Sequence, residues 1–320
     1  MTRIVYLGFP QGEVTGGQKM ILRHVETLRD LGFDAIAWNN PENVPAPGLD
    51  HRAPVEVGTA FRAADILVVP DDAPRALAQA SQMVRKRSVV FCQSAISLAS
   101  VGAPSIDHYP AERFPPFITV APGVAGAIRR IYPQADVHVV PAFADERLFQ
   151  PGNQRRNRIV VWPKKRPAEA RAIRSLLPRL HPQSALPFVA IDKAPERDMA
   201  RAFASSTVFL SLARMESLGI TPLEAMASGC VVAGFTGIGG RDFATPENGF
   251  WVEEDNVFAA TDALAAACDL VRRGGPDLVR MWEAGRATAE AWSYARFRVR
   301  LEETWMTLAP EARLKDGPLD

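Results

Sequence analysis

The sequence predicts an α/β protein made of two doubly wound domains, each a parallel sheet with helices on both faces. Two observations support this prediction. Short apolar, β-branched runs alternate with segments of helical periodicity along nearly the whole chain, a pattern typical of parallel sheets with helical crossovers. The alternation is interrupted over residues 141–157, where proline, glycine and charged residues concentrate. We therefore expect an interdomain linker there.

The first half of the chain begins with a strand and then alternates. Strands are predicted over residues 4–9, 35–38, 66–70, 89–92, 117–120 and 137–140. Apolar spacing predicts helices over residues 18–31, 74–85 and 124–131. A glycine-bearing loop over residues 12–17 precedes the first helix, and Gly32 is expected to end that helix.

The alternation resumes in the second half. Strands are predicted over residues 159–162, 188–191, 208–212 and 231–235. Helices are predicted over residues 168–177, 197–205, 258–273 and 293–308, and a shorter one ends at Gly229. The expected domains are residues 1–148, residues 149–292, and a C-terminal helical segment over 293–320 that packs back toward the first domain.

Composition narrows the class of protein. Lys and Arg total 37 against 36 Asp and Glu, so the near-neutral charge argues against a nucleic-acid-binding protein. The three cysteines have no metal or redox spacing and are expected to be buried thiols. No apolar run approaches the roughly 18 residues of a membrane span, and the first residues read as a strand, so neither a membrane span nor a signal peptide is expected. A cytoplasmic protein is expected.

Two glutamates, Glu216 and Glu224, lie eight positions apart across a predicted strand-to-helix junction. Glu216 ends a buried strand, where a carboxylate is rarely placed without a partner. Glu224 has a structural explanation, because residues 221–224 match a capping box with Thr221 as the N-cap. It could also accept hydrogen bonds from ribose hydroxyls. Between the two, the amides of Ser217, Leu218 and Gly219 precede a helix and could bind an anion.

Cations follow the first strand of the second domain, at Lys164, Lys165 and Arg166. They are either a solvated loop or a group that neutralises a diphosphate as it leaves. Since no Asp-x-Asp appears in a suitable loop, no metal ion or other cofactor is expected.

The other candidate positions belong to the first domain. Gly16 and Gly17 could allow a phosphate or sugar to approach the backbone closely. Gln93 and Ser94 end a buried strand and are candidates for the acceptor side.

The segment from Glu216 to Gly229 resembles the E-x7-E motif of retaining glycosyltransferases with the GT-B fold. The region of Gly16 and Gly17 resembles the first loop and helix of that family, and residues 139–151 resemble its interdomain segment. The resemblance covers most of residues 3–310, being strong over 205–252 and thin over 40–115.

The resemblance implies two facing Rossmann-like domains with a cleft between them, and a metal-independent sugar transfer from a UDP- or GDP-sugar. Glu216 would contact the donor sugar, Glu224 the ribose, and Lys165 and Arg166 the diphosphate. The acceptor would be a glycan, a lipid-linked sugar or another molecule. Peripheral contact with the inner face of a membrane stays open, with residues 85–87 and 129–130 as its basic clusters.

Two alternatives remain at this point. A protein of this fold could be a nucleotide-sugar epimerase. It could also be a degenerate, non-catalytic protein that binds sugar nucleotides, because the cationic segment around Lys164 departs from the family pattern. The donor, the acceptor and the oligomeric state are not determined by the sequence.

Overall fold

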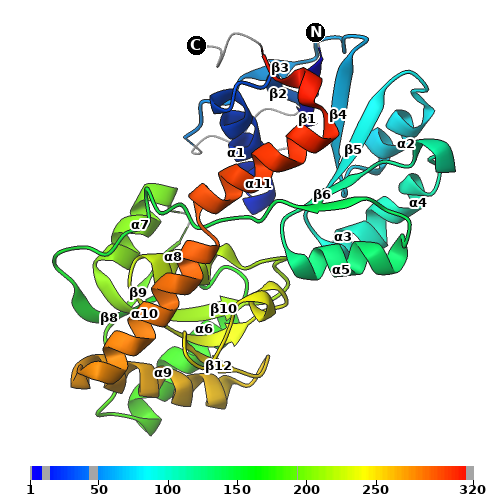
Figure 1. Ribbon diagram of the computed structural model, residues 1–320. Helices are drawn as coiled ribbons and strands as arrows, with labels where there is room; N and C mark the ends of the chain where they lie inside the picture. The colour runs from blue at the N-terminus through cyan, green and yellow to red at the C-terminus, as the bar shows by residue number, and fades with distance from the viewer. Residues whose placement is uncertain (1, 9–14, 43–49, 193, 315–320) are drawn as a thin grey trace. The chain divides into compact units, whose positions relative to one another are not determined.

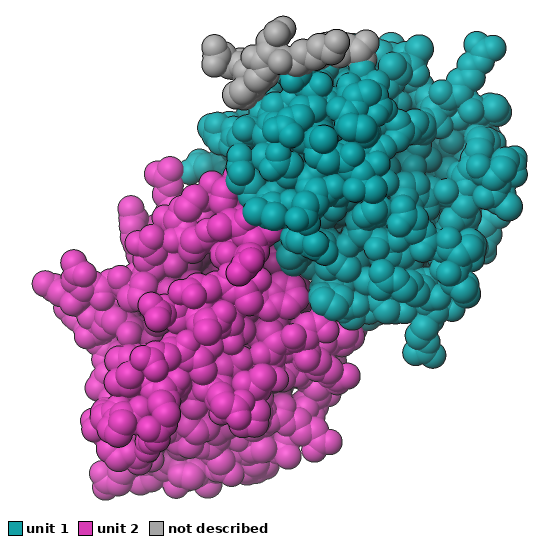
Figure 2. Space-filling view, viewed as in Figure 1, with its two compact units in different colours: residues 1–141, 298–320 teal, residues 142–297 magenta. Residues whose placement is uncertain are grey.

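A computed structural model describes residues 2–8, 15–42, 50–192 and 194–314 of the chain. Residue 9 of the predicted first strand, residues 12–14 of the predicted loop and the terminal residues 315–320 lie outside these ranges. The chain divides into two compact units (Figure 2). Unit 1 consists of Met1–Pro141 with Arg298–Asp320, and unit 2 consists of Ala142–Phe297.

Unit 1 contains a seven-stranded parallel sheet in the order β3-β2-β1-β4-β5-β6-β7 (Figure 1). Its strands are β1 (Arg3–Leu7), β2 (Ala35–Asn39), β3 (Val55–Val57), β4 (Asp65–Pro70), β5 (Arg87–Cys92), β6 (Phe117–Thr119) and β7 (Val137–Val139). Ile4 on β1 is paired with Ala35 on one side and with Ile66 on the other. The winding of the sheet therefore reverses between β1 and β4.

The helices of unit 1 are α1 (Gly16–Asp30), α2 (Pro74–Gln82), α3 (Ala95–Ser97), α4 (Ala103–Ile106) and α5 (Pro122–Ile131). Helix α1 begins two residues earlier than predicted because Thr15 caps it. The Thr15 hydroxyl accepts from the Gln18 amide at 3.3 Å, and the Gln18 side chain accepts from the Thr15 amide at 3.2 Å. The sequence pattern does not predict β3, α3 or α4, which are too short to show a period.

Helix α11 (Tyr294–Leu308) leads the chain into the C-terminal part of unit 1. Leu301 and Trp305, both on the apolar stripe of this helix, are fully buried. The Trp305 indole lies 3.3 Å from the Tyr6 hydroxyl on β1, and the Tyr6 hydroxyl in turn lies 2.9 Å from Nδ1 of His24. The C-terminal helix is thus part of the core of unit 1.

Unit 2 contains a five-stranded parallel sheet in the order β12-β11-β10-β8-β9. Its strands are β8 (Arg156–Val161), β9 (Phe188–Ala190), β10 (Ser206–Ala213), β11 (Val231–Thr236) and β12 (Phe250–Val252). Strand β8 pairs with β9 on one side and with β10 on the other, so the winding reverses between β8 and β10.

The helices of unit 2 are α6 (Pro167–Leu180), α7 (Glu196–Ala204), α8 (Ile220–Ala227), α9 (Val257–Arg273) and α10 (Pro276–Ala291). Buried side chains of α6 and α9, such as Ile173 and Leu264, form one core with Leu210 of β10. The sequence pattern does not predict α10 because few of its 16 residues are buried, which leaves its apolar period weak.

The segment predicted as a linker belongs largely to unit 2. Phe143 and Phe149 are buried, and the Ala144 amide donates to the Trp292 carbonyl at 3.0 Å. The Gly152 amide donates to the Ala204 carbonyl at 3.0 Å. These contacts hold residues 142–157, the larger part of the predicted linker, against unit 2.

Each sheet has one point where its winding reverses, and open α/β sheets bind ligands outside the carboxyl ends of the strands at such a point. In unit 1 this point lies between the ends of β1 and β4, and in unit 2 between the ends of β8 and β10. These two edges contain most of the residues that the sequence singles out.

Candidate functional site

The loop after β10 places Glu216 at the carboxyl edge of the unit 2 sheet. Every residue of β10 is buried, so the strand is fixed up to Ala213. The Arg214 amide donates to one oxygen of the Glu216 side chain at 2.5 Å, and the Glu216 carbonyl accepts from the Gly239 amide at 2.9 Å. The carboxylate is therefore oriented by the backbone of its own loop.

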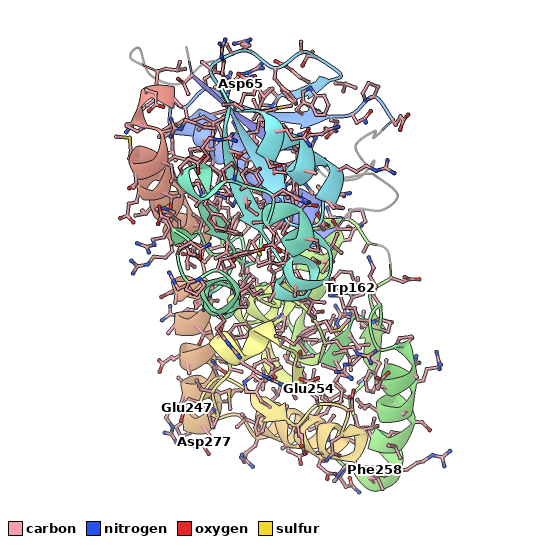
Figure 3. The ribbon with its side chains drawn as sticks, turned by 90° about the vertical axis from the view of Figure 1, so that its right-hand side faces the viewer. Asp65, Trp162, Glu247, Glu254, Phe258 and Asp277 are labelled. Carbon is pink, nitrogen blue, oxygen red and sulfur yellow. The ribbon has the colours of Figure 1, made fainter. Side chains whose placement is uncertain are left out.

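Lys165 meets Glu216 across the point where the winding reverses. The Lys165 ammonium nitrogen lies 2.8 Å from the second oxygen of the Glu216 carboxylate. The lysine is 49% exposed and the glutamate 24%, so both remain accessible to a ligand. Lys164 lies 5.9 Å above the ring of Trp162, the residue after β8 that is labelled in Figure 3. The structure thus brings together two residues that the sequence predicts as catalytic.

Arg166, the third residue predicted as catalytic, is directed into unit 2. Its side chain is 1% exposed, and its Nε donates to the Ala213 carbonyl at 3.1 Å. The remaining nitrogens bind Glu169, Glu254 and Asp255. The guanidinium also lies 4.6 Å above the ring of Phe235. Since all three nitrogens have protein partners, this arginine does not present a free cation to a phosphate.

A glycine turn after β11 packs against the Glu216 loop. A Cβ atom on Gly239 would lie 2.4 Å from backbone atoms of Ser217 and Leu218, so only glycine allows this approach. The turn is held by Glu254 (Figure 3), whose carboxylate accepts from the Gly237 amide at 2.8 Å. Glu254 is a site residue that sequence reasoning missed, because the preceding strand β12 is too short to be predicted.

Helix α8 starts at Ile220, with Gly219 as its N-cap at a φ of +78° and without a side-chain cap. The predicted capping box is therefore wrong. Thr221 is the second residue of the helix and Glu224 is the fifth, one turn from the start. The amides of Ser217, Leu218 and Gly219 donate no hydrogen bond to another described residue. Amides without a partner before a helix are the donors that bind anions; Ser217 is partly exposed, whereas Leu218 and Gly219 are buried.

Glu224 is 4% exposed, although it does not cap the helix. Burial of a carboxylate in the second turn of a helix needs a partner. The structure gives it one or more such interactions, while its position places it just behind the amides at the start of α8.

The residues predicted on the acceptor side gather at the carboxyl edge of the unit 1 sheet. The Gln93 side-chain amide donates to the Gly17 carbonyl at 3.2 Å, which joins the end of β5 to the start of α1. Ser94 is the N-cap of α3, because its hydroxyl accepts from the Ser97 amide at 3.2 Å. A Cβ atom on Gly16 would meet no described atom within 4 Å, so no close approach within the described residues requires a glycine there.

Asp71, which sequence reasoning missed, follows β4 at the same edge. Its side chain is 2% exposed, and Oδ1 accepts from the Gln93 amide at 2.9 Å. Oδ2 is buried without a hydrogen-bond partner among the described residues. Burial raises the pKa of Asp71 to about 7. Its signal in the sequence is a carboxylate directly after a predicted buried strand.

Two kinds of feature are absent from the part of the chain that the structure describes. No group of three or more His, Cys, Asp or Glu side chains is arranged there to hold a metal ion. None of the helices in the described ranges combines the length and the apolar character that a membrane crossing requires.

Comparison with known proteins places these features in context. A family model described as glycosyl transferases group 1 matches residues 190–286, which include both glutamates. Over 280 residues the chain is 27% identical to an alpha-1,6-glucosyltransferase of Actinobacillus pleuropneumoniae serotype 7 (strain AP76), covering 83% of each chain.

Two solved structures are similar to the whole chain. HepE from Anabaena, in complex with UDP and glucose, has a TM-score of 0.69 at 16% identity and covers 96% of this chain and 99% of its own. Sucrose-phosphate synthase from Thermosynechococcus elongatus has a TM-score of 0.66 at 15% identity, and the match covers 97% of this chain and 100% of the synthase chain. These likenesses show that the fold is GT-B, as the sequence predicts.

Proposed function

The chain belongs to the glycosyl transferases of group 1, and from this premise we propose that it transfers glucose from UDP-glucose to a hydroxyl group of a glycan, with retention at the anomeric carbon. The observation that carries the proposal is the Lys165–Glu216 pair at the point where the unit 2 sheet reverses. A cation, a carboxylate and unpaired amides meet there, and these are the groups that a sugar diphosphate requires.

Each group has a role toward the donor. The amides of Ser217, Leu218 and Gly219 bind diphosphate oxygens, and Lys165 supplies the positive charge beside them. Glu216 accepts hydrogen bonds from sugar hydroxyls, and Glu224 accepts them from the ribose. Arg166 acts as a positioning residue, because it holds Glu254, which in turn holds the glycine turn against the Glu216 loop.

The reaction needs no nucleophile from the protein. The bond between the anomeric carbon and the β-phosphate oxygen breaks, and the acceptor oxygen forms a bond to the same carbon from the same face. The proton of the acceptor hydroxyl passes to the departing phosphate oxygen. Negative charge grows on that phosphate in the transition state, so Lys165 and the amides lower the barrier most where they contact it.

The proposal that glucose is the transferred sugar, and that a 6-hydroxyl group of the acceptor receives it, rests on the similar proteins. The similar bacterial protein is named an alpha-1,6-glucosyltransferase, and HepE has been solved with UDP-glucose. The glucose of UDP-glucose is α-linked, so an α-linked product means retention. On the acceptor side we assign Gln93 and Asp71 of unit 1, which follow neighbouring strands, and we retain Ser94 as a candidate.

Metal independence is part of the proposal, since Lys165 and the amides supply the charge that a divalent ion would otherwise supply. The expected result is unchanged turnover after treatment with EDTA. A loss that Mg²⁺ or Mn²⁺ restores would contradict it. A lipid-linked acceptor is the second option for the glycan, and comparing a water-soluble glucoside with its lipid-linked form distinguishes the two.

The central experiment mixes the purified protein with UDP-glucose and an alkyl β-glucoside and follows UDP release and product structure. NMR should show a new α-linkage at the 6-hydroxyl. A β-linkage would contradict retention. UDP release with an epimerised sugar and no need for acceptor would indicate an epimerase. Donor binding without turnover, seen by calorimetry, would indicate a binding protein. Glu216→Ala is the matched inactive control.

A further inference from the structure

A cavity lies in unit 1, at the amino ends of strands β4 and β5. It has a volume of about 340 Å³, which falls in the size range of small-molecule sites. Its walls come from the starts of these strands, the turn after α2, residues 112–116 and helix α11. Asp71 and Gln93 follow the carboxyl ends of the same two strands, so the cavity lies at the opposite edge of the sheet from the acceptor-side residues.

Part of the cavity lining is apolar. Phe114, Pro116 and Leu308 line it, and all three are partly exposed, so a ligand can contact them. Tyr109 also lines it, and its hydroxyl accepts from the Ser88 hydroxyl at 3.2 Å. Such a lining suits the apolar part of a ligand, because contact with it removes hydrocarbon from water.

The rim is strongly basic. Four cations line the cavity, Arg85, Lys86, Arg87 and Arg113, against one acid, Glu112, so the lining has a formal charge of +3 (four minus one). The formal net charge of the whole chain is only +1. Positive charge is therefore concentrated at this cavity.

The protein neutralises only part of this charge. Lys86 donates to the Arg62 carbonyl, and Arg113 to the Ser81 carbonyl at 3.4 Å. These acceptors carry no formal charge. Arg87 has an ionic partner, Glu311, at 2.5 Å. Arg85 forms no ion pair with any described residue and is exposed. With Glu112 and Glu311 both counted, the four cations leave a formal excess of two positive charges for an anion that enters the cavity.

We propose that this cavity binds a phosphate group attached to an apolar body. Several guanidinium and ammonium groups around one opening suit a group with more than one anionic oxygen. The apolar body would lie against Phe114 and Leu308. Val84, which also lines the cavity, is 72% exposed, and this apolar side chain stands next to Arg85. A phosphate on an apolar body can come from a lipid or from a soluble phosphate ester.

The test measures binding and is independent of sugar transfer, so its failure would leave the proposed function untouched. Calorimetry on the full chain would use two soluble probes, inorganic phosphate alone and monomeric dihexanoylphosphatidic acid. Flotation would use phosphatidylcholine vesicles with and without phosphatidylglycerol. Binding of the short-chain lipid and of the anionic vesicles supports a lipid source, and binding of inorganic phosphate without vesicle binding supports a soluble one. Absence of binding by all three would overturn the proposal.

Matched variants locate the site. Arg85→Ala with Lys86→Ala should weaken binding about tenfold or more, since it removes two cations that can form charge-assisted hydrogen bonds to phosphate oxygens. Arg129→Ala with Arg130→Ala removes an exposed basic pair on α5 that does not line the cavity, and should leave binding unchanged. Val84→Ser alters an exposed side chain without disturbing the core and should weaken binding of the lipid only. Equal binding by the two double variants would overturn the proposal.

Discussion

The ammonium nitrogen of Lys165 lies 2.8 Å from a carboxylate oxygen of Glu216, and the two residues follow neighbouring strands, β8 and β10, between which the sheet of unit 2 reverses. An ion pair this exposed contributes little to stability. We therefore expect the ion pair to serve function and not stability: each residue positions the other at the place where a donor would bind.

The first prediction concerns the coupling of this pair. Lys165→Ala should lower kcat about a hundredfold, because it removes charge stabilisation from the leaving phosphate. Glu216→Ala should do at least as much, and the double variant should lose less than the product of the two losses. In urea unfolding the same variants should differ from the wild type by less than about 1 kcal/mol. If the loss in the double variant equalled the product of the two single losses, the two residues would act independently, which would contradict the prediction. Lys164→Ala serves as the neighbouring control.

A second prediction tests the start of helix α8. Because Gly219 is the N-cap, Thr221→Ala should change the free energy of unfolding by no more than about 0.5 kcal/mol. Loss of an N-cap threonine would cost about 1 kcal/mol. Glu224→Gln should weaken binding of UDP roughly tenfold or more through lost charge-assisted hydrogen bonds to ribose. A clear destabilisation by Thr221→Ala would show that Thr221 caps the helix after all. Calorimetry with UDP measures the effect of Glu224→Gln.

Sequence reasoning succeeded where a pattern has one structural meaning. Runs such as Val208–Leu212 alternate with helical segments, and this rhythm predicts a parallel sheet and the edge at which its strands end. Since β8 and β10 were both predicted, the residues that follow them were expected at the carboxyl edge of one sheet. Lys165 and Glu216 could be singled out in this way, but their contact depends on β8 and β10 being neighbours, which the structure shows.

The rest depended on contacts between residues distant in sequence. Arg166 looks like a third exposed cation, and only the fold shows that Glu254 and Asp255, nearly ninety residues later, bury and occupy it. The capping box around Thr221 failed for a local reason, since Gly219 at positive φ is the N-cap and the helix starts two residues earlier than predicted. Asp71 was not identified from the sequence, because its burial, which raises its pKa, becomes visible only once the strands and helices of unit 1 are packed together.

The third prediction distinguishes Arg166 from its two lysine neighbours. Arg166→Ala leaves Glu254, which is 25% exposed, without its cationic partner, and removing one partner of such a hydrogen-bonded pair costs about 1–3 kcal/mol. Thermal unfolding should show this loss, whereas Lys164→Ala should leave stability nearly unchanged. Arg166→Lys should rescue little, because an ammonium group cannot serve three separate partners in the geometry of a guanidinium. If Arg166→Ala kept wild-type stability and lost only turnover, a direct role at the diphosphate would return.

A fourth prediction concerns Gly239. A methyl group there would lie 2.4 Å from the backbone of Ser217 and Leu218, so Gly239→Ala should push the Glu216 loop away and cost about 1–3 kcal/mol. UDP-glucose binding should fall further than stability, because the displaced amides belong to the donor site. Gly285→Ala in α10 is the control in the same unit, since its Cβ would lie an ordinary 3.5 Å from Met226. Equal effects of the two substitutions in calorimetry and urea unfolding would contradict the proposed packing role.

The last prediction uses the raised pKa of Asp71. In the folded protein burial brings this pKa to about 7, above the 3.8 of an ordinary aspartate. Between these two values the folded state keeps a proton that the unfolded state has lost. The contribution of Asp71 to stability is therefore fully present below about pH 4, declines as the pH rises, and is lost above about pH 7. A tenfold difference in proton affinity between the two states corresponds to about 1.4 kcal/mol, so the decline should be of the order of 2–4 kcal/mol.

Asp71→Asn should abolish most of this decline and be more stable than the wild type at pH 8, because the amide is neutral and can still accept from the Gln93 amide. Urea unfolding at pH 5 and pH 8 measures the difference. Asp72→Asn is the neighbouring control, since burial also raises the pKa of Asp72 and its charge helps to raise the pKa of Asp71. It should retain most of the dependence. If Asp71→Asn kept the full decline in stability while Asp72→Asn removed it, the group that titrates would be Asp72. Asp71 would then be ionised in the folded protein, which would contradict the prediction.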